Sequence, residues 1–156
     1  MGVVIDIPGW RRLELDHLVL DLNGTLARDG ALLGGVTGLV MQLSQRLTVH
    51  LATADTFGGA ESLLPPPVRL TRLAPGQEAE QKLALVRRLG AERSAALGNG
   101  ANDALMLAAA ALGVAVIGPE GAAMAALNAA DVVVGDPLAG LELLLHPDRL
   151  RATLRR

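Results

Sequence analysis

The order of apolar and polar positions along the chain predicts short β-strands that alternate with amphipathic helices. Strand-length runs that are apolar or have period two are Val3–Ile7, Arg12–Leu15, His17–Asp21, Thr48–Thr53, Val68–Leu73, Ser94–Leu97, Val114–Ile117 and Val132–Val134. Helical spacing predicts helices over Val36–Leu47, Phe57–Leu63, Pro75–Leu89, Ala104–Leu112, Glu120–Asn128, Pro137–Leu145 and Asp148–Leu154. The first two strands flank a Pro8-Gly9-Trp10 turn, which predicts an N-terminal β-hairpin.

Strands that alternate with helices are typical of an α/β fold, in which helices cover both faces of a parallel sheet. The run His17–Asp21 is apolar up to its last residue, as expected of a buried central strand. No repeat, linker or low-complexity tract divides the 156 residues, which suffice for one domain with a substantial core. We therefore predict a single three-layer α/β domain over residues 1–156, with a mainly parallel central sheet.

Polar side chains directly follow three of the predicted strands. They are Asp21, Asn23 and Thr25, then Thr53 and Asp55, then Asn99, Asn102 and Asp103. The carboxyl ends of parallel strands share one sheet edge, so these groups are expected to meet there, and Lys82 lies on a helix that returns toward the same edge. Together they are the parts of a site for Mg²⁺ and phosphate, although each residue alone is also common in turns and helix caps.

The composition argues against several classes of function. The formal net charge is −2, cysteine is absent, and the aromatic residues are Trp10 and Phe57, so nothing favours nucleic-acid binding, base stacking or thiol chemistry. The start of the chain lacks a basic-then-apolar leader and the apolar stretch Ala104–Gly118 is too short and mixed for a bilayer, so we predict a cytoplasmic protein without membrane partners. Of 14 basic residues, Lys82 is the single lysine, and a compact ammonium suits contact with a phosphoryl group.

Four segments together resemble the motifs of the haloacid dehalogenase (HAD) superfamily, and within it the soluble P-type-ATPase-like branch. Asp21-Leu22-Asn23-Gly24-Thr25 matches the first motif, Asp-x-Asp-Gly-Thr. Thr53-Ala54-Asp55 is similar to the Thr-Gly-Asp of P-type ATPases, and Lys82 fits the third motif. Gly98-Asn99-Gly100-Ala101-Asn102-Asp103 matches the fourth motif, Gly-Asp-Gly-x-Asn-Asp. Each motif alone is weakly specific, but the ordered set covers almost the whole chain and is specific.

The resemblance implies a HAD-like (Rossmannoid) fold and a phosphoaspartate mechanism with Mg²⁺ as cofactor. Asp21 would attack the phosphoryl group of a phosphorylated small molecule or a macromolecular phosphoester. The implied catalytic residues are Asp21, Asn23, Thr53 and Lys82; the implied phosphate ligands are Thr25, Thr53, Ala54, Lys82 and Asn102; the implied metal ligands are Asp21, Asn23 through its carbonyl oxygen, Asn99 and Asp103. In-line transfer needs little from the protein beyond positioning and charge.

Two departures from the family pattern bear on activity. Asn23 stands where the family's phosphatases have a general acid/base Asp, and Asn99 stands where the family has a metal-binding acid. An amide cannot exchange a proton, and it binds Mg²⁺ less strongly than a carboxylate does. Two hypotheses therefore stay open: a slow phosphohydrolase or phosphotransferase, in which Asp55 partly compensates as a ligand, and a degenerate HAD domain that binds phosphate, metal or a protein partner without turnover.

The segments between the motifs are filled by ordinary predicted helices and loops, so no cap domain is expected. An uncapped site is open to water unless something covers it, which favours a homo-oligomer or a macromolecular substrate. A dinucleotide-binding Rossmann domain is disfavoured because no Gly-x-Gly-x-x-Gly follows the first strand of the sheet.

Overall fold

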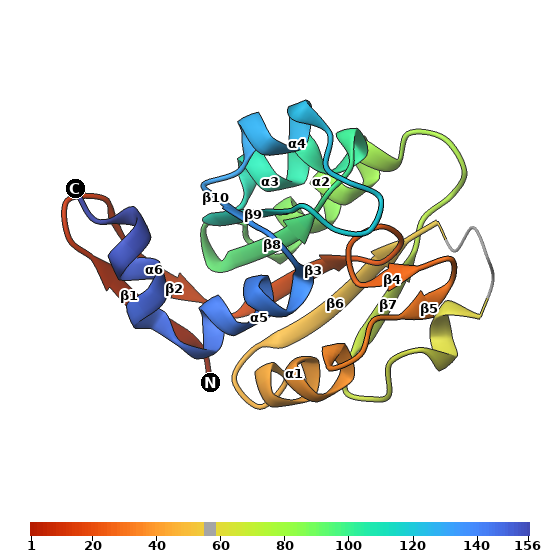
Figure 1. Ribbon diagram of the computed structural model, residues 1–156, viewed down its shortest axis with the longest axis horizontal. Coiled ribbons are helices and arrows are strands. Elements are labelled where there is room, and N and C mark those ends of the chain that lie inside the picture. The colour runs from red at the N-terminus through yellow and green to blue at the C-terminus, as the bar shows by residue number, and fades with distance from the viewer. Residues whose placement is uncertain (55–58) are drawn as a thin grey trace.

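The computed structural model describes residues 1–54 and 59–156 and confirms the α/β architecture with helices on both faces of a central sheet (Figure 1). Six parallel strands form this sheet in the order β10-β9-β8-β3-β6-β7. The strands are β1 Val3–Ile7, β2 Arg11–Leu15, β3 His17–Asp21, β4 Ala27–Arg28, β5 Ala31–Leu32, β6 Thr48–Thr53, β7 Arg69–Arg72, β8 Ser94–Gly98, β9 Leu112–Val116 and β10 Val132–Val134. The helices are α1 Val36–Leu43, α2 Glu78–Leu89, α3 Ala104–Ala109, α4 Met124–Ala129, α5 Pro137–Leu145 and α6 Pro147–Leu154.

Strand β3 lies in the middle of the sheet, between β6 and β8, and its side chains divide the core into two layers. Leu18 and Leu20 face a large cluster of Leu, Ile and Val side chains on the side of α1 and α5. Val19 faces the opposite side, where α2, α3 and α4 pack. A strand with both faces covered must be apolar throughout, which is why the run that ends at Asp21 carries no polar residue in its interior.

The core layer beneath α2 and α3 is built from small side chains. Four neighbouring strands each present one of them to these helices: Val19, Ala52, Ala96 and Ala115. Leu85 and Val86 of α2 and Met106 and Leu107 of α3 fill the space above, and all four are buried. Because small residues let a helix approach the sheet closely, this layer determines how near α2 lies to β3.

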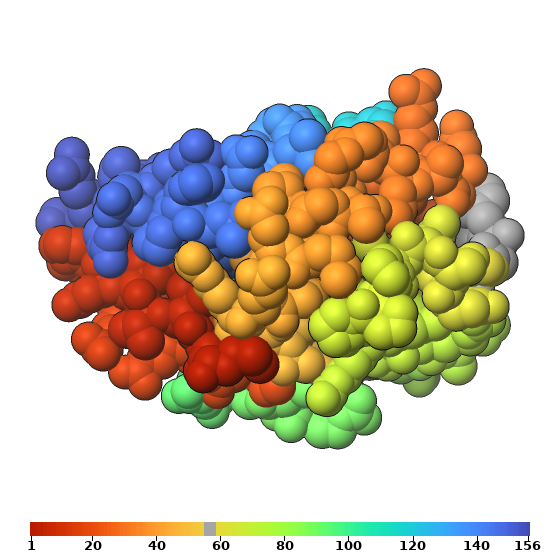
Figure 2. All heavy atoms as spheres, turned by 90° about the horizontal axis from the view of Figure 1, so that it is seen from below, coloured from red at the N-terminus to blue at the C-terminus, as the bar shows by residue number. Residues whose placement is uncertain are grey.

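The hairpin of β1 and β2 packs against α6 at one end of the molecule. The first and last parts of the chain lie side by side there (Figure 2), and the Arg156 N–H donates to the Pro8 carbonyl at 2.9 Å. The predicted hairpin is therefore confirmed, and it contributes Ile5, Leu13 and Leu15 to the large core layer. None of the helices in the described part of the chain has the length and hydrophobicity needed to cross a bilayer.

Five predicted helices have different bounds in the structure, including α2, which begins at Glu78 instead of Pro75, and α6, which begins at Pro147 instead of Asp148. α1 ends at Leu43, four residues before the predicted end, in turn-type hydrogen bonds that lead into β6. α3 ends at Ala109 because Leu112 already begins β9. α4 begins at Met124, since the Ala123 N–H donates to the Asn99 carbonyl at 2.8 Å and the preceding residues form a turn. The predicted helix Phe57–Leu63 is a 3-10 turn over Ala60–Ser62, and Phe57 lies outside the described residues.

A buried histidine pair lies away from the carboxyl ends of the strands. His17 Nδ1 and His50 Nε2 are 3.2 Å apart, and His50 is 4% exposed. Burial, together with repulsion from His17, Arg69 and Arg88, lowers the pKa of His50 to about 4. The folded protein therefore resists protonation of His50, whereas the unfolded chain accepts a proton near pH 6.5.

We expect this histidine to make the folded state less stable in mild acid. Above pH 6.5 His50 is neutral in both states, and between pH 6.5 and 4 only the unfolded state is protonated, so the free energy of unfolding falls by up to about 1.4 kcal/mol per pH unit. His50→Gln should flatten this part of the pH profile in urea unfolding measured from pH 7 to 4.5. His146→Gln, which changes an exposed histidine, is the control and should leave the slope unchanged. Parallel profiles for the wild type and His50→Gln would contradict the prediction.

Candidate active site

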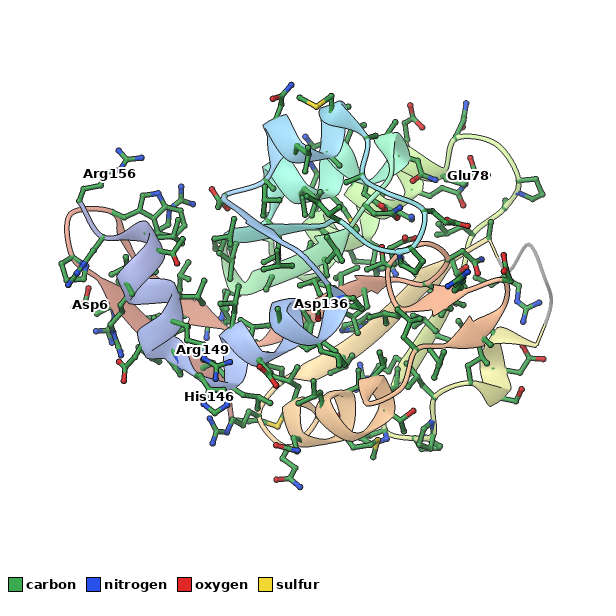
Figure 3. All side chains as sticks on the ribbon, viewed as in Figure 1. Asp6, Glu78, Asp136, His146, Arg149 and Arg156 are labelled. Atoms are coloured by element: carbon green, nitrogen blue, oxygen red, sulfur yellow. The ribbon has the colours of Figure 1, made fainter. Side chains whose placement is uncertain are left out.

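A polar cavity of about 270 Å³ opens at the carboxyl ends of the central strands. Loops after β3, β6, β8 and β9 and the start of α2 enclose it, and its lining residues are Asp21, Asn23, Thr53, Ala54, Leu73, Glu78, Lys82, Asn99, Gly100, Asn102 and Glu120. Figure 3 labels Glu78 at the start of α2, far from the end of the molecule where Arg149 and Arg156 lie. Each of the three strand-end clusters predicted from the sequence therefore contributes residues to one cavity, although Thr25 and Asp103 do not line it, and Asp55 lies outside the described residues.

Asp21 ends β3 and projects into this cavity with 7% of its surface exposed. The chain turns sharply after it, and Gly24 takes a φ of +78°, a left-handed conformation that other residues rarely adopt. The N–H groups of Thr25, Leu26 and Ala27 donate to the Leu22 carbonyl and close the turn. This turn holds the Asp21 carboxylate at the mouth of the sheet.

Lys82 projects from α2 and joins two carboxylates. Its Nζ is 2.7 Å from Asp21 Oδ1 and 2.7 Å from Asp103 Oδ1, and the residue is 2% exposed. Burial alone would lower the pKa of Lys82, but the attraction of Asp21 and Asp103 outweighs it and raises the pKa. Lys82 is therefore a firmly charged ammonium between two acids, which leaves this group of three side chains with an excess of negative charge.

The Asp21 carboxylate is less acidic than an ordinary aspartate. Burial and the nearby charge of Asp103 raise its pKa to about 6, against the opposing effects of Lys82 and the Thr25 hydroxyl. Its second oxygen, Oδ2, lies 2.9 Å from Thr25 Oγ1, which is also 3.0 Å from Asn99 Oδ1. Because a hydroxyl has one proton, Thr25 donates to one of these two oxygens at a time.

Two predicted site residues, Thr25 and Asp103, are fully buried and do not line the cavity. Thr25, predicted as a phosphate ligand, has no exposed surface and does not line the cavity, since its hydroxyl is used to hold Asp21 and Asn99. Asp103, predicted as a metal ligand, is also fully buried. Its Oδ1 accepts from Lys82, and its Oδ2 accepts from the N–H groups of Asn99 and Gly100 at 3.0 and 2.9 Å. Asp103 therefore contacts Lys82 and the β8 loop in this structure, and its role as a metal ligand stays a prediction.

The two amides that replace family acids behave differently from each other. Asn23 lines the cavity, and its Oδ1 is buried without a hydrogen-bond partner among the described residues. Asn99 has hydrogen-bond partners at both side-chain atoms: its Oδ1 shares the Thr25 hydroxyl with Asp21, and its Nδ2 donates to the Gly121 carbonyl at 3.1 Å. The donor half of this arrangement requires an amide, because an ionised Asp has no proton to give.

Sequence reasoning missed two carboxylates in the cavity wall. Glu78 begins α2, and its carboxylate accepts from the Gly76 N–H at 3.2 Å. Glu120 was assigned to a helix, but it lies in the turn between β9 and α4. Its place directly after the apolar run Val114–Ile117, the fourth such run of the sheet to end in polar residues, was the pattern that could have indicated it.

The oxygen-rich wall of the cavity fits a hard divalent cation. Mg²⁺ prefers carboxylate, amide and carbonyl oxygens, and an orphaned buried oxygen such as Asn23 Oδ1 gains a partner when a cation with its water shell is near. Within residues 1–54 and 59–156, no three His, Cys, Asp or Glu side chains form a group that could hold a metal unaided. A cation here would therefore need amide or main-chain oxygens as well as carboxylates.

Comparison with known proteins identifies one relative by sequence. No protein-family model matches the chain. An uncharacterized protein of Methanocaldococcus jannaschii is 43% identical over 84 residues, which is 51% of this chain and 90% of that protein. The similarity therefore spans nearly all of the archaeal protein and about half of this chain.

Solved structures with the same fold include two phosphatases and a HAD-superfamily hydrolase. The cobalt-bound deoxy-D-mannose-octulosonate 8-phosphate phosphatase (YrbI) of Haemophilus influenzae superimposes with a TM-score of 0.62 and 18% identity, over 88% of this chain and 91% of that one. The corresponding Moraxella catarrhalis enzyme, with magnesium, phosphate and KDO, gives 0.63 and 18% over 90% and 94%. A HAD-superfamily (subfamily III A) hydrolase structure from Legionella pneumophila, whose function is not assigned, gives 0.61 and 17% over 90% and 87%.

Proposed function

Because the chain belongs to the same family as the uncharacterized Methanocaldococcus jannaschii protein and has the fold of the HAD superfamily, we propose that it is a Mg²⁺-dependent phosphohydrolase or phosphotransferase that acts through an aspartyl-phosphate on Asp21. The observation that carries the proposal is the buried contact between Asp21 and Lys82 at the floor of the cavity. A carboxylate that is positioned at a strand end and paired with one lysine is the nucleophile arrangement that the chemistry requires.

The proposed step forms a bond between an Asp21 oxygen and phosphorus and breaks the bond from phosphorus to the leaving oxygen. Asp21 Oδ1 accepts from Lys82, and Oδ2 shares the Thr25 hydroxyl with Asn99, so each Asp21 oxygen keeps a lone pair for attack. Thr53, Ala54 and Asn102 line the cavity around Asp21, where they can bind the phosphoryl oxygens. Lys82 stabilises the negative charge on Asp21 and on the incoming phosphoryl group. A phosphotransferase passes the group to an acceptor, and a hydrolase passes it to water.

The cation supports this chemistry by offsetting charge. Asp21, Asn23 and the other oxygens of the wall would hold Mg²⁺, which when bound neutralises charge on the transferring phosphoryl group. A cation is needed because carboxylates outnumber ammonium groups in and beside the cavity. Lys82 supplies one positive charge, and the carboxylates are those of Asp21, Glu78, Glu120 and the adjacent Asp103. A phosphate dianion would otherwise be repelled.

The size of the cavity favours a compact phosphomonoester as substrate. About 270 Å³ is at the lower end of the range for small-molecule sites, and it accommodates a phosphoryl group with a small leaving group. The structural neighbours from Haemophilus influenzae and Moraxella catarrhalis are phosphatases of a sugar-acid 8-phosphate, which supports the same class. A macromolecular phosphoester that inserts only its phosphoryl group is the alternative substrate.

The proposal is tested by trapping the phosphoenzyme. The purified protein is incubated with acetyl phosphate and Mg²⁺, quenched in acid, digested and analysed by mass spectrometry. We expect one phosphoryl group on the peptide that contains Asp21, lost on treatment with hydroxylamine, and no such modification in Asp21→Asn. A phosphomonoester panel then measures turnover of the same two proteins.

The second candidate function is a binding module that has lost turnover, which is favoured by the two amides at positions 23 and 99. It predicts that the wild type forms no phosphoenzyme and hydrolyses no member of the panel, yet binds Mg²⁺ and phosphate by calorimetry. The P-type-ATPase-like character, the homo-oligomer and the cytoplasmic location remain predictions from the sequence.

A further inference from the structure

Asn99 stands where the fourth motif has a metal-binding acid, and both polar atoms of its side chain have hydrogen-bond partners. Asn99 uses its oxygen to accept from Thr25 and its nitrogen to hold the Gly121 carbonyl. Its main-chain carbonyl accepts from the Ala123 N–H at 2.8 Å. The side chain of Asn99 is thus bound to the turn Gly118–Gly121, and its main chain is bound to Ala123, the residue before α4.

This turn is fitted closely against the loop that carries Asp21. The Gly121 N–H donates to the Gly118 carbonyl at 2.9 Å, which closes the turn around Pro119 and Glu120. A Cβ on Gly118 would lie 2.5 Å from the Gly24 carbonyl oxygen, closer than such atoms approach in proteins. The two loops therefore touch through main-chain atoms, and the position of Glu120 relative to Asp21 is set by this contact.

The Glu120 carboxylate extends from the turn to Gly24, where it lies beside the Asn99 amide. A Cβ placed on Gly24 would overlap Glu120 Oε2 and would lie 2.7 Å from Asn99 Nδ2. Glu120 also lines the cavity together with Asp21 and Asn23, and Asn23 Oδ1 has no hydrogen-bond partner within residues 1–54 and 59–156. Glu120 is an exposed residue that makes no ion pair in the described part of the chain, so its carboxylate is available to a ligand.

From this geometry we propose that Glu120 supplies the carboxylate that position 99 lacks, and binds the divalent cation together with Asp21 and an oxygen of Asn23. Asn99 then acts as a positioning residue, since its amide N–H₂ holds the turn that carries Glu120. The site then has the same number of carboxylates as the family pattern, but one of them comes from the loop after β9 and not from the loop after β8. This inference rests on the proposed function, because it names a ligand of the cation that the phosphoryl transfer uses.

Mn²⁺ binding to the full chain, measured by electron paramagnetic resonance of the free ion, tests the proposal directly. We expect Glu120→Gln to weaken Mn²⁺ binding by about 10–100-fold, as for loss of a group that organises a metal site. The matched control is Glu80→Gln, which removes one negative charge from an exposed position of α2 that does not line the cavity, and it should change the affinity less than threefold. Circular dichroism verifies that both variants fold.

A charge-exchange variant makes the test specific for location. Glu120→Gln combined with Asn99→Asp returns a carboxylate to the spot beside Gly24, and we expect it to restore the Mn²⁺ affinity to within threefold of the wild type. The proposal is overturned if Glu120→Gln binds Mn²⁺ as tightly as the wild type, if Glu80→Gln loses as much affinity as Glu120→Gln, or if the exchange restores nothing.

The two proposals fail in different ways. If the wild type forms a phosphoenzyme on Asp21 and Glu120→Gln keeps its Mn²⁺ affinity, the role of Glu120 is wrong and the proposed function stands. If Mn²⁺ affinity depends on Glu120 but no phosphoenzyme forms, the cation site stands and the proposed function is wrong.

Discussion

Asn23→Asp is expected to raise the turnover of a phosphomonoester by about 10²–10⁴-fold, the usual contribution of a general acid/base. Asn23 lines the cavity beside Asp21, and its Oδ1 is buried without a hydrogen-bond partner in the part of the chain that the structure describes, so a carboxyl group there breaks no such hydrogen bond of that atom. An amide can neither protonate the leaving oxygen nor take a proton from water, whereas a carboxyl group can do both. Initial rates with Mg²⁺ and a chromogenic phosphomonoester measure the effect.

The control for this gain is Asn102→Asp, the same chemical change at another residue of the cavity wall. A new carboxylate there should repel the phosphate and lower turnover, because it adds charge without an acid at the leaving oxygen. Equal rates for Asn23→Asp and the wild type, or a similar gain in both variants, would show that Asn23 does not limit the rate.

Lys82→Met is expected to lower the free energy of unfolding by about 3–5 kcal/mol at pH 7.5, the cost of removing one partner from a buried ion pair. Lys82 lies 2.7 Å from both Asp21 and Asp103, and its loss leaves two buried carboxylates that repel each other. Protonation relieves this repulsion, so the loss should be smaller at pH 5 than at pH 7.5. Urea unfolding at the two pH values measures both quantities.

Arg149→Met is the control for the ion pair. Arg149 binds Glu142 at the same distance of 2.7 Å, but its side chain is 53% exposed, so we expect a loss below about 1 kcal/mol. A triple variant that adds Asp21→Asn and Asp103→Asn to Lys82→Met should recover much of the stability, since no buried charge then remains. If Lys82→Met costs no more than Arg149→Met, the buried group of three does not stabilise the fold.

Much of the fold follows from the hydrophobic pattern. β6, β10 and α5 have their predicted bounds. Asp131 and Gly135 flank the apolar run of β10, and Asp136 and His146 flank the mainly apolar run of α5, so the sequence marks both ends of these elements. The convergence of Asp21, Lys82 and Asn99 at one cavity also follows from the sequence, since parallel strands place their carboxyl ends together. Alanine-rich segments were less informative: a run such as Ala104–Leu112 has no polar residue to separate a helix from the strand that follows it.

The roles of individual polar groups could not be read from the sequence, because they depend on which atoms face inward. The sequence does not show that the Asp103 oxygens accept hydrogen bonds from Lys82 and from two main-chain N–H groups, and the binding of a cation by Asp103 stays a prediction. Thr25 was expected to bind phosphate and is instead closed off beneath Asp21. Glu120 was placed in a helix, although a main-chain contact with Gly24 determines its position, and such a contact has no sequence pattern.

The layer of small side chains beneath α2 has a consequence for how the protein can evolve. Ala52 and Val19 determine how close α2, and with it Lys82, lies to the sheet, because Leu85 and Val86 of α2 pack in the same core layer as these two residues. A bulkier side chain at either position would lift the helix and lengthen the bridge to Asp21, so that a change in the apolar interior would alter the chemistry at the surface. Selection for that chemistry therefore restricts interior positions that never touch the substrate.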